Sequence, residues 1–493
     1  MASMYHSTRS SVKECSAKRA VLDGLAPDGG LYVSDALGSA RIDLARIVEG
    51  TYRENAALIL GILLDDYSPE EIAACVEAAY GGTFASEAVT PVVRVGDSFV
   101  LELFGGPTSA FKDVALQMLP QLMSRAAAHA GERIMILAAT SGDTGKAALA
   151  GFADTPGLGI TVFFPHRGTS EIQRLQMVTQ TGGNVGVGAV RGNFDDTQSA
   201  VKLIFGDEAL AARLRERGVV LSSANSINIG RLAPQVVYYF DAYAQLVRQG
   251  ALRCGDEVEF CVPTGNFGDV LAGYFARRMG LPVRRLIVAS NANNVLTDFL
   301  STGVYDRRRP FRKTISPSMD ILISSNLERL LYYLSDGDTA LVSRLMDDLA
   351  NEGRYEVPAA LLERIKEVFA CGFADDDETR AAMKECFDAH GYVLDPHTAA
   401  AWHVSQAVPK DAGVARVVLA TASPYKFCRD VCDALGIEAE GSDFACMRAL
   451  AQASGVEPPA ALAALEGAPV RFDDVMDPQD MASYVERKCG ELL

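Results

Sequence analysis

Lys112 is the side chain of this sequence whose surroundings best suit covalent chemistry. It lies in the small-residue stretch Gly105–Asp113 and is followed by the helix-prone residues Val114–Met118. Most single lysines are exposed on protein surfaces, so a surface lysine is the ordinary interpretation. An amine that apolar, glycine-rich surroundings take out of water has a lowered pKa and becomes a usable nucleophile. Lys112 is therefore a candidate reactive group.

Two glycine-rich segments downstream could bind anions near such an amine. Thr140–Gly145 reads TSGDTG, and Pro263–Asp269 reads PTGNFGD. Glycines let backbone N–H groups turn toward an anion, and a helix start adds positive partial charge. An ordinary strand-to-helix turn is the alternative for each segment alone. A lysine amine beside a phosphate-binding loop is the minimum needed to hold pyridoxal 5'-phosphate as a Schiff base, and we expect this cofactor.

The first glycine-rich segment is not a nucleotide-binding P-loop. A P-loop needs glycine where this chain has Thr140, and it needs Ser or Thr where Ala147 follows Lys146. What remains is a hydroxyl-rich turn at a helix start, which could receive a carboxylate. The six histidines lack the spacing of a zinc protease or a catalytic triad, so we expect them to be structural and expect no metal site.

A third polar segment could bind a second anion. Asn225, Ser226 and Arg231 group an amide, a hydroxyl and a guanidinium within seven residues. An arginine can clamp a phosphate with two parallel hydrogen bonds. The alternative is a loop with a surface salt bridge.

The elements that must position these residues alternate between short apolar runs and helical stretches. This alternation predicts an α/β fold with two parallel or mostly parallel sheets flanked by helices. Three apolar runs lead directly into polar loops: 134–139 into Thr140, 258–262 into Thr264, and 417–420 into Thr421. Because ligands bind beyond the carboxyl ends of parallel strands, we expect the site there. The remaining predicted strands are 160–164, 185–187, 219–221 and 286–289.

Four parts of the chain are expected. Residues 40–90 are rich in helix formers, and Pro69 with the acidic residues after it marks a helix start. The expected parts are a mainly helical N-terminal domain at 1–95, a large cofactor-binding α/β domain at 96–129 and 226–440, a smaller α/β domain at 130–225, and a tail at 441–493 packed on the large domain. The acidic run at 375–378 is expected to be a solvated helix start.

Composition excludes several classes of protein. The 493 residues are 49% hydrophobic and 22% charged, which is typical of a globular protein. A net charge of −17 argues against nucleic acid as a partner. No apolar run reaches the ~20 residues that span a membrane. Ten cysteines without a CxxC pair favour reduced thiols in a cytoplasmic protein, which we expect to be a monomer or homodimer.

Taken together, these segments resemble the threonine synthases, pyridoxal-phosphate enzymes of the tryptophan-synthase-β fold family (fold type II). The similarity extends from residue 5 to about residue 430. The segments that carry it, in family order, are Tyr5–Arg9, Gly24–Val33, Gly106–Thr108 with Ala110–Asp113, Thr140–Gly145, Gly192–Asp196, Asn225–Asn228 with Arg231, Pro263–Gly268, Ser316–Ile321 with Ser324–Asn326, and Leu419–Ala422.

The resemblance implies a role for each candidate residue. Lys112 would carry the cofactor and move protons. The residues implied to hold the cofactor are Lys112, Asp143, Gly265, Asn266, Phe267, Gly268, Asp269 and Thr421. Those implied to bind the substrate are Ser141, Gly142, Thr144, Asn225, Ser226 and Arg231. An ionised Asp143 would repel the cofactor's phenolate, so we expect it to bond backbone N–H groups or hydroxyls instead.

The implied reaction converts O-phospho-L-homoserine and water to L-threonine and phosphate, as a carbon–oxygen lyase. The alternatives are a phospholyase or a threonine or serine dehydratase that releases 2-oxobutyrate, or an idle ligand-binding protein. Three positions depart from the family pattern and bear on the choice of substrate: Ser423, Tyr425 and Lys146.

Overall fold

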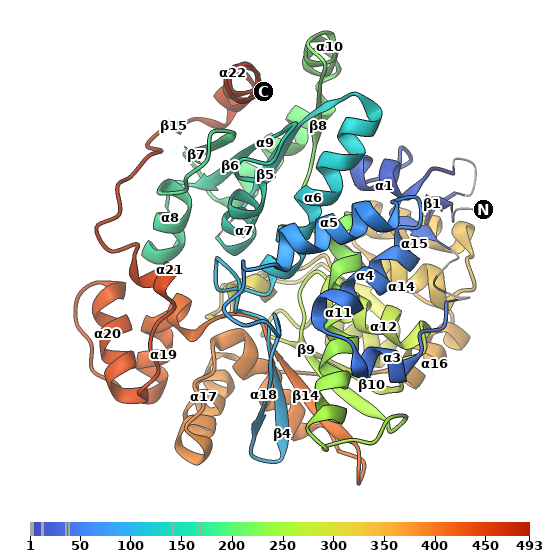
Figure 1. Ribbon diagram of the computed structural model, residues 1–493, viewed down its shortest axis with the longest axis vertical. Coiled ribbons are helices and arrows are strands. Elements are labelled where there is room, and N and C mark those ends of the chain that lie inside the picture. Colours follow the sequence, from blue (N-terminus) through green and yellow to red (C-terminus); the bar gives the residue numbers. More distant parts are fainter. Residues whose placement is uncertain (1–3, 11–13, 35–36, 38–39, 141, 168) are drawn as a thin grey trace.

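The computed structural model describes residues 4–10, 14–34, 37, 40–140, 142–167 and 169–493. Two mostly parallel sheets form the centre of the fold, and helices pack on both faces of each (Figure 1). The expected α/β class is therefore confirmed. Within the described ranges, no helix is both long and apolar enough to cross a bilayer.

The larger sheet has six strands, and all neighbours are parallel except β3 and β4 at one edge. Phe260 and Leu419 point into one core, whereas Cys261 and Val418 point into the opposite core. Strands buried on both faces must be apolar throughout, which explains the continuous apolar runs. In spatial order the strands are β13 (Phe369–Phe373), β10 (Val283–Ser290), β9 (Val258–Pro263), β14 (Ala415–Ala420), β4 (Ser98–Glu102) and β3 (Val92–Val95).

The smaller sheet has five strands, and every neighbouring pair is parallel. One face packs against α6 (Lys112–Ala130) and α7 (Asp143–Phe152), and the other against α9 (Phe194–Gly206), α10 (Glu208–Glu216) and α22 (Met481–Leu492). In spatial order the strands are β15 (Val475–Met476), β7 (Val185–Val190), β6 (Leu158–Pro165), β5 (Arg133–Ala139) and β8 (Val219–Ser222). Helix α8 (Glu171–Val178) follows β6.

The end of the chain packs on the smaller sheet, so the expectation that 441–493 lies on the large domain is wrong for its last part. β15 extends the small sheet beside β7. Met481 and Val485 of α22 share a core with Met135 and Phe163. Figure 1 shows the chain passing from α19 (Cys428–Leu435) and α20 (Asp443–Ser454) to α22 over the small sheet. The outer face of that sheet is apolar and needs this cover.

The N-terminal region is mainly helical, as expected, but β3 within 1–95 belongs to the large sheet. Its α5 begins at Pro69, and Ser68 and Glu71 form a capping box. Helices α3 and α4 pack against α11 (Ile229–Arg248). The elements here are β1 (Tyr5–Ser7), α1 (Ala17–Asp23), β2 (Tyr32–Ser34), α3 (Leu44–Glu49), α4 (Tyr52–Leu63) and α5 (Pro69–Tyr80).

The remaining elements surround the large sheet or connect its strands. Asp375 and Glu378 form the capping box of α17, which confirms the acidic run as a helix start. The helices are α12 (Gly268–Arg278), α13 (Val295–Thr302), α14 (Leu327–Leu334), α15 (Thr339–Asn351), α16 (Ala359–Val368), α17 (Asp376–His390), α18 (Pro396–Ala407) and α21 (Ala460–Ala463). The short strands β11 (Val304–Asp306) and β12 (Arg354–Glu356) pair with each other. The 3-10 turns are η1 (Pro317–Met319), η2 (Pro424–Phe427) and η3 (Pro478–Asp480).

Candidate active site

Lys112 lies where two loops of the large sheet are joined. Ala110 and Ala422 form an isolated antiparallel bridge. The N–H of Phe111 donates to the carbonyl of Thr421 at 2.8 Å. These contacts place Lys112, the first residue of α6, beside the loop that follows β14. Because β9 is the parallel neighbour of β14, the loop after β9 opens at the same edge of the sheet.

The amine of Lys112 is buried, and the whole residue is only 8% exposed. Its Nζ donates to Oγ of Ser318 at 3.2 Å and lies 3.8 Å from Oδ2 of Asp143. Burial lowers the pKa of the Lys112 ammonium group to about 8, while the Asp143 carboxylate opposes that shift. An amine that loses its proton near neutral pH is suited to act as a nucleophile and as a base.

Asp143 contacts cations, so the expectation that it bonds backbone N–H groups or hydroxyls is wrong. Its Oδ1 lies 2.8 Å from Nζ of Lys426 and accepts from Nε2 of Gln173 at 3.0 Å. Burial alone would raise the pKa of the carboxyl group, but the Lys426 and Lys112 cations hold that pKa well below its usual range. The carboxylate therefore stays ionised in a site where an anion without cations would be unfavourable.

The loop that precedes Asp143 is shaped by close packing. A Cβ at Gly142 would lie 2.5 Å from the side chain of Gln173. Oγ1 of Thr140 accepts from the N–H groups of Gly142 and Gly145, both at 3.0 Å. Thr144 is half-buried in the first turn of α7. Ser141, also expected in the site, lies outside the described residues.

The loop after β9 has the features of an anion cradle. Gly268 is the first residue of α12, and the first N–H groups of a helix have no acceptor within the helix. Phe267 just before it has a left-handed φ of 62°, which is unusual for a residue with a side chain. A Cβ at Gly265 would lie 2.8 Å from the carbonyl oxygen of Ser318. The carbonyl of Asn266 accepts from the N–H of Asn326 at 3.0 Å.

Asp269 directs its carboxyl group toward α11. Oδ1 accepts from the hydroxyls of Tyr238 at 2.5 Å and Tyr239 at 2.9 Å. Oδ2 is buried and has no hydrogen-bond partner in the described part of the chain. Burial raises the pKa of this carboxyl group to about 6, against the lowering effect of the two hydroxyls. A charge at Asp269 is therefore costly.

The segment from Asn225 to Arg231 lies beside the β9 loop. Nδ2 of Asn326 donates to the carbonyl of Ser226 at 3.2 Å and to that of Asn266 at 3.1 Å, so one side chain joins the two loops. Arg231 is 4% exposed, and among the described residues its Nε has no acceptor. Burial lowers the pKa of its guanidinium group to about 10, which still leaves it charged at neutral pH. A buried cation with an unused donor suits an anionic ligand.

Thr421 completes the set of expected residues that meet at this edge of the sheet. It is 6% exposed, and its N–H donates to Oγ1 of Thr398 at 3.3 Å. Asn225, by contrast, is exposed. Within the described part of the chain, no cluster of three or more His, Cys, Asp or Glu side chains could hold a metal ion.

Three families match this chain, each over a different segment. The family described as "Threonine synthase N terminus" matches residues 4–80, "Pyridoxal-phosphate dependent enzyme" matches residues 86–423, and "Threonine synthase, C-terminal" matches residues 398–485. Threonine synthase of Pseudomonas aeruginosa is 40% identical over 426 residues, which cover 86% of this chain and 88% of that protein. The chain belongs to the threonine synthase family.

Two further comparisons agree with this family. A crystal structure described as PLP-bound threonine synthase from Brucella melitensis has a TM-score of 0.88 and 38% sequence identity, and it covers 99% of this chain and 100% of that one. Human "Threonine synthase-like 1" is 40% identical over 432 residues, which make up 85% of this chain. The chain spans only 58% of the length of that human relative.

The residues at the site fit the cofactor of this family. Pyridoxal phosphate needs an amine that can lose its proton, a phosphate cradle and a shielded pocket. Lys112 is buried with a lowered pKa. The cradle has no space for a side chain at Gly265, and Gly268 opens a helix. The unused donor of Arg231 adds a place for a second anion.

The three residues that depart from the family pattern, Ser423, Tyr425 and Lys146, each form a hydrogen bond to a group other than the Lys112 amine. The hydroxyl of Tyr425 donates to the carbonyl of Val456 in the C-terminal segment. Nζ of Lys146 donates to Oε1 of Gln180. The N–H of Ser423 donates to the carbonyl of Ser109, which helps to join the two loops at Lys112. The structure thus gives these residues positions beside the site, with Tyr425 and Lys146 bonded away from the Lys112 amine.

Several residues reach the site that were not among the predicted site residues. They are Gln173, Ser318, Asp395, His397 and Lys426. Ser318 lies in a segment that carried the family resemblance, and Lys426 follows Thr421 closely, so proximity to known motifs was the available signal. Nε2 of His397 accepts from the N–H of Ser318 at 3.1 Å, and Nδ1 faces Oδ1 of Asp395 at 2.8 Å.

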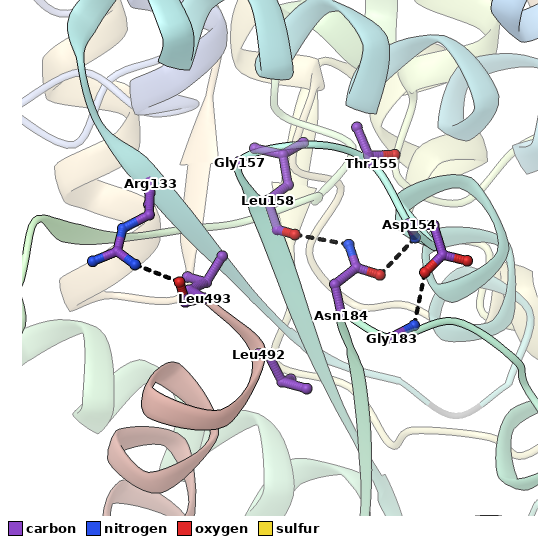
Figure 2. A pocket seen from close by; sticks show the side chains of 9 residues that line it. All are labelled: Arg133, Asp154, Thr155, Gly157, Leu158, Gly183, Asn184, Leu492 and Leu493. Atoms are coloured by element: carbon purple, nitrogen blue, oxygen red, sulfur yellow. Dashed lines mark hydrogen bonds between the residues drawn. The ribbon is translucent and has the colours of Figure 1, made fainter.

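A separate pocket of about 340 Å³ lies at the opposite edge of the small sheet (Figure 2). Arg133 and Leu158 begin β5 and β6, so the pocket is at the amino ends of these strands, away from the loops described above. The side chain of Asn184 bridges Leu158 and Asp154 there. The full lining is Arg133, Asp154, Thr155, Gly157, Leu158, Gly183, Asn184, Leu492 and Leu493. It contains none of the expected site residues.

Proposed function

We propose that this protein converts O-phospho-L-homoserine and water to L-threonine and phosphate with pyridoxal 5'-phosphate as cofactor. The observation that carries the proposal is the pair of anion-binding loops beside Lys112. Asn326 joins the carbonyls of Asn266 and Ser226, so the two loops are neighbours. One loop suits the phosphate of the cofactor, and the other suits the phosphate of the substrate.

The roles follow from what each group offers. The bound cofactor supplies an electron sink for the carbon next to the substrate amine. Lys112 removes and returns the proton at Cα, because its amine can be neutral near physiological pH. Gly265, Asn266, Phe267, Gly268 and the N–H of Asp269 would hold the phosphate of the cofactor, and Thr421 would contact its ring nitrogen.

The substrate is oriented from two sides in this proposal. Gly142 and Thr144, at the start of α7, receive its carboxylate, and the same role is proposed for Ser141, which lies outside the described residues. Asn225, Ser226 and Arg231 receive its phosphate, with the unused Nε of Arg231 as the main donor. Asp143 would act through Lys112 and Lys426, the two lysines that it contacts.

A phospholyase or dehydratase would use the same lysine and release 2-oxobutyrate. A buried arginine beside the second loop favours a phosphorylated substrate over free threonine or serine. The distinction between threonine and 2-oxobutyrate depends on preventing premature protonation of the reacting carbons before water has added.

A product assay tests the proposal. Purified protein with pyridoxal phosphate is given O-phospho-L-homoserine, and phosphate, threonine and 2-oxobutyrate are measured together. Equal amounts of threonine and phosphate are expected. Release of 2-oxobutyrate in place of threonine would show a phospholyase, and the absence of any phosphate release would refute both the synthase and the phospholyase reactions.

The setting of the enzyme is also proposed. All ten cysteines are free thiols, which agrees with a reducing compartment such as the cytoplasm. We propose a monomer or homodimer acting on a small molecule, with no nucleic-acid or membrane partner.

A further inference from the structure

A second buried lysine lies against the proposed catalytic site. The side chain of Lys426 is 0% exposed. It comes from η2, the turn that follows β14. Its Nζ lies 2.8 Å from Oδ1 of Asp143 and donates to the carbonyl of Thr108 at 2.9 Å. An ammonium group with no access to water is stable only with such partners.

Asp143 faces two lysines at unequal distances. Lys426 is 2.8 Å from Oδ1, within hydrogen-bond reach, whereas Lys112 is 3.8 Å from Oδ2. Nε2 of Gln173 also donates a hydrogen bond to Oδ1 of Asp143, at 3.0 Å. Because attraction between charges rises as their separation falls, the carboxylate of Asp143 interacts more strongly with Lys426 than with Lys112.

Charged side chains from several helices and from the turn η2 surround Lys112. Burial is the main cause of the lowered pKa of Lys112; the carboxylates of Asp143 and Asp113 oppose the shift, and two cations add to it. The facing groups are Asp113 on α6, Asp143 on α7, Arg231 on α11, Asp269 on α12 and Lys426 on η2. His397 on α18 and Asp395, which caps the N-terminus of that helix, lie behind Ser318.

We infer that Lys426 is a positioning residue whose ammonium group compensates Asp143 and so lets Lys112 exist as the neutral amine. This inference rests on the proposed function, in which that amine takes the Cα proton. When Lys426 and Asp143 are both charged, their charges cancel. A proton on Lys112 would then add a positive charge that this pair does not compensate, so the neutral amine is favoured. Without Lys426, Asp143 would draw the proton onto Lys112 instead.

The ion pair between Asp143 and Lys426 also connects the part of the fold built on the small sheet with the part built on the large sheet. Asp143 begins α7, which packs on the small sheet, and Lys426 lies in η2 at the end of a strand of the large sheet. Gln176 of α8 makes a second crossing contact, because its Nε2 donates to the carbonyl of Thr108 at 3.3 Å. Charge compensation at Lys112 therefore requires α7 to be seated against η2.

The test measures the pKa of Lys112 directly in the full-length chain freed of cofactor. The rate at which an amine-specific reagent labels Lys112 is followed against pH, with peptide mass spectrometry to identify the site. In Lys426→Met the pKa of Lys112 should rise by about 1–2 units, because a neighbouring like charge has been removed. Lys426→Arg keeps the cation and should restore the original pKa.

Lys146→Met is the matched control. Lys146 is another mostly buried lysine on α7, but it bonds Gln180 and makes no ion pair with Asp143. Its removal should leave the pKa of Lys112 unchanged. In the holoenzyme, the free amine of Lys112 is available only after substrate has bound, so the kcat profile is the one that reports it. The acidic limb of that profile should move to higher pH in Lys426→Met and stay in place in Lys146→Met.

The outcomes separate this inference from the proposed function. An unchanged or lowered pKa of Lys112 in a folded Lys426→Met protein overturns the inference, even if the native enzyme makes threonine. If Lys426→Met does not fold, Lys426→Gln is used, because its amide can still donate to the carbonyl of Thr108. The labelling experiment needs no turnover, so failure of the product assay leaves its result intact.

Discussion

Gly265 offers a direct test of the phosphate cradle, because the structure leaves no space for a side chain there. An added Cβ would lie 2.8 Å from the carbonyl oxygen of Ser318 and 3.4 Å from Cα of Met319. Carbon and oxygen in a weak contact rest about 3.3 Å apart or more, so the loop or the 3-10 turn η1 must shift by roughly 0.5 Å. Both obstacles are backbone atoms that cannot rotate away.

The expected cost follows from that overlap. Forcing an extra methyl group into a packed site costs about 1–3 kcal/mol. Because the shifted loop contains the N–H groups that face the phosphate, most of this cost should appear in cofactor affinity. Gly265→Ala should therefore bind pyridoxal phosphate roughly 5- to 150-fold more weakly. Titration of the cofactor into stripped protein, followed by visible absorbance, measures the change.

Two other glycines serve as controls. Gly268 lies in the same loop, but a Cβ there would meet Asn326 at 3.4 Å, an ordinary contact, so Gly268→Ala should weaken binding less than Gly265→Ala. Gly61 lies on the exposed side of α4 with no atom within 4 Å of an added Cβ. Gly61→Ala should leave affinity unchanged and stabilise the protein by up to about 1 kcal/mol. Native affinity in Gly265→Ala would refute the placement of the cofactor phosphate.

Three other predictions concern single side chains. Arg231→Gln should raise KM for O-phospho-L-homoserine by roughly 10- to 150-fold, because a charged hydrogen bond contributes about 1.5–3 kcal/mol, while the cofactor titration stays native; equal losses in both would contradict a role limited to the substrate phosphate. The pKa of Asp269 is raised to about 6 in the folded protein from an unfolded value near 3.8, so the stability that its protonated form contributes is complete below about pH 4 and is lost as pH rises to 6. Over that pH range, Asp269→Asn should gain about 3 kcal/mol of stability relative to the native protein, as measured by denaturant unfolding. A difference in stability that stays constant across pH would refute this. Ser318→Ala removes the hydroxyl 3.2 Å from Nζ of Lys112 and should lower kcat more than it raises KM, whereas Ser318→Thr should retain most activity; a pure KM effect would argue against contact with the reactive amine.

Much of the α/β framework could be predicted from local sequence. The runs 134–139, 258–262 and 417–420 form β5, β9 and β14, because strands buried on both faces must be apolar at every position. The three loops after them lie at the carboxyl edges, as parallel topology requires. Lys112 was identified from its neighbours alone, and its burial agrees with that prediction.

Elements at the margins of the sheets were harder to foresee. β13 forms an edge of the large sheet and is only partly buried, and β15 has two residues. Neither carries the continuous apolar pattern of a central strand. The prediction that the tail packs on the large domain is wrong for β15 and α22, because the sequence of an amphipathic helix such as α22 shows that one face is buried but leaves the partner of that face open.

The electrostatics of the site depended on tertiary structure. The sequence by itself determined the candidate lysine, the glycine-rich loops and the resemblance to the family, since each depends on short stretches of residues. That Lys426 and Gln173 would reach Asp143, and that Arg231 would be buried with an unused donor, followed only from the folded chain. Local patterns set which residues are buried, whereas sheet order and loop packing decide which distant charges meet, and those distances set the proton affinity of Lys112.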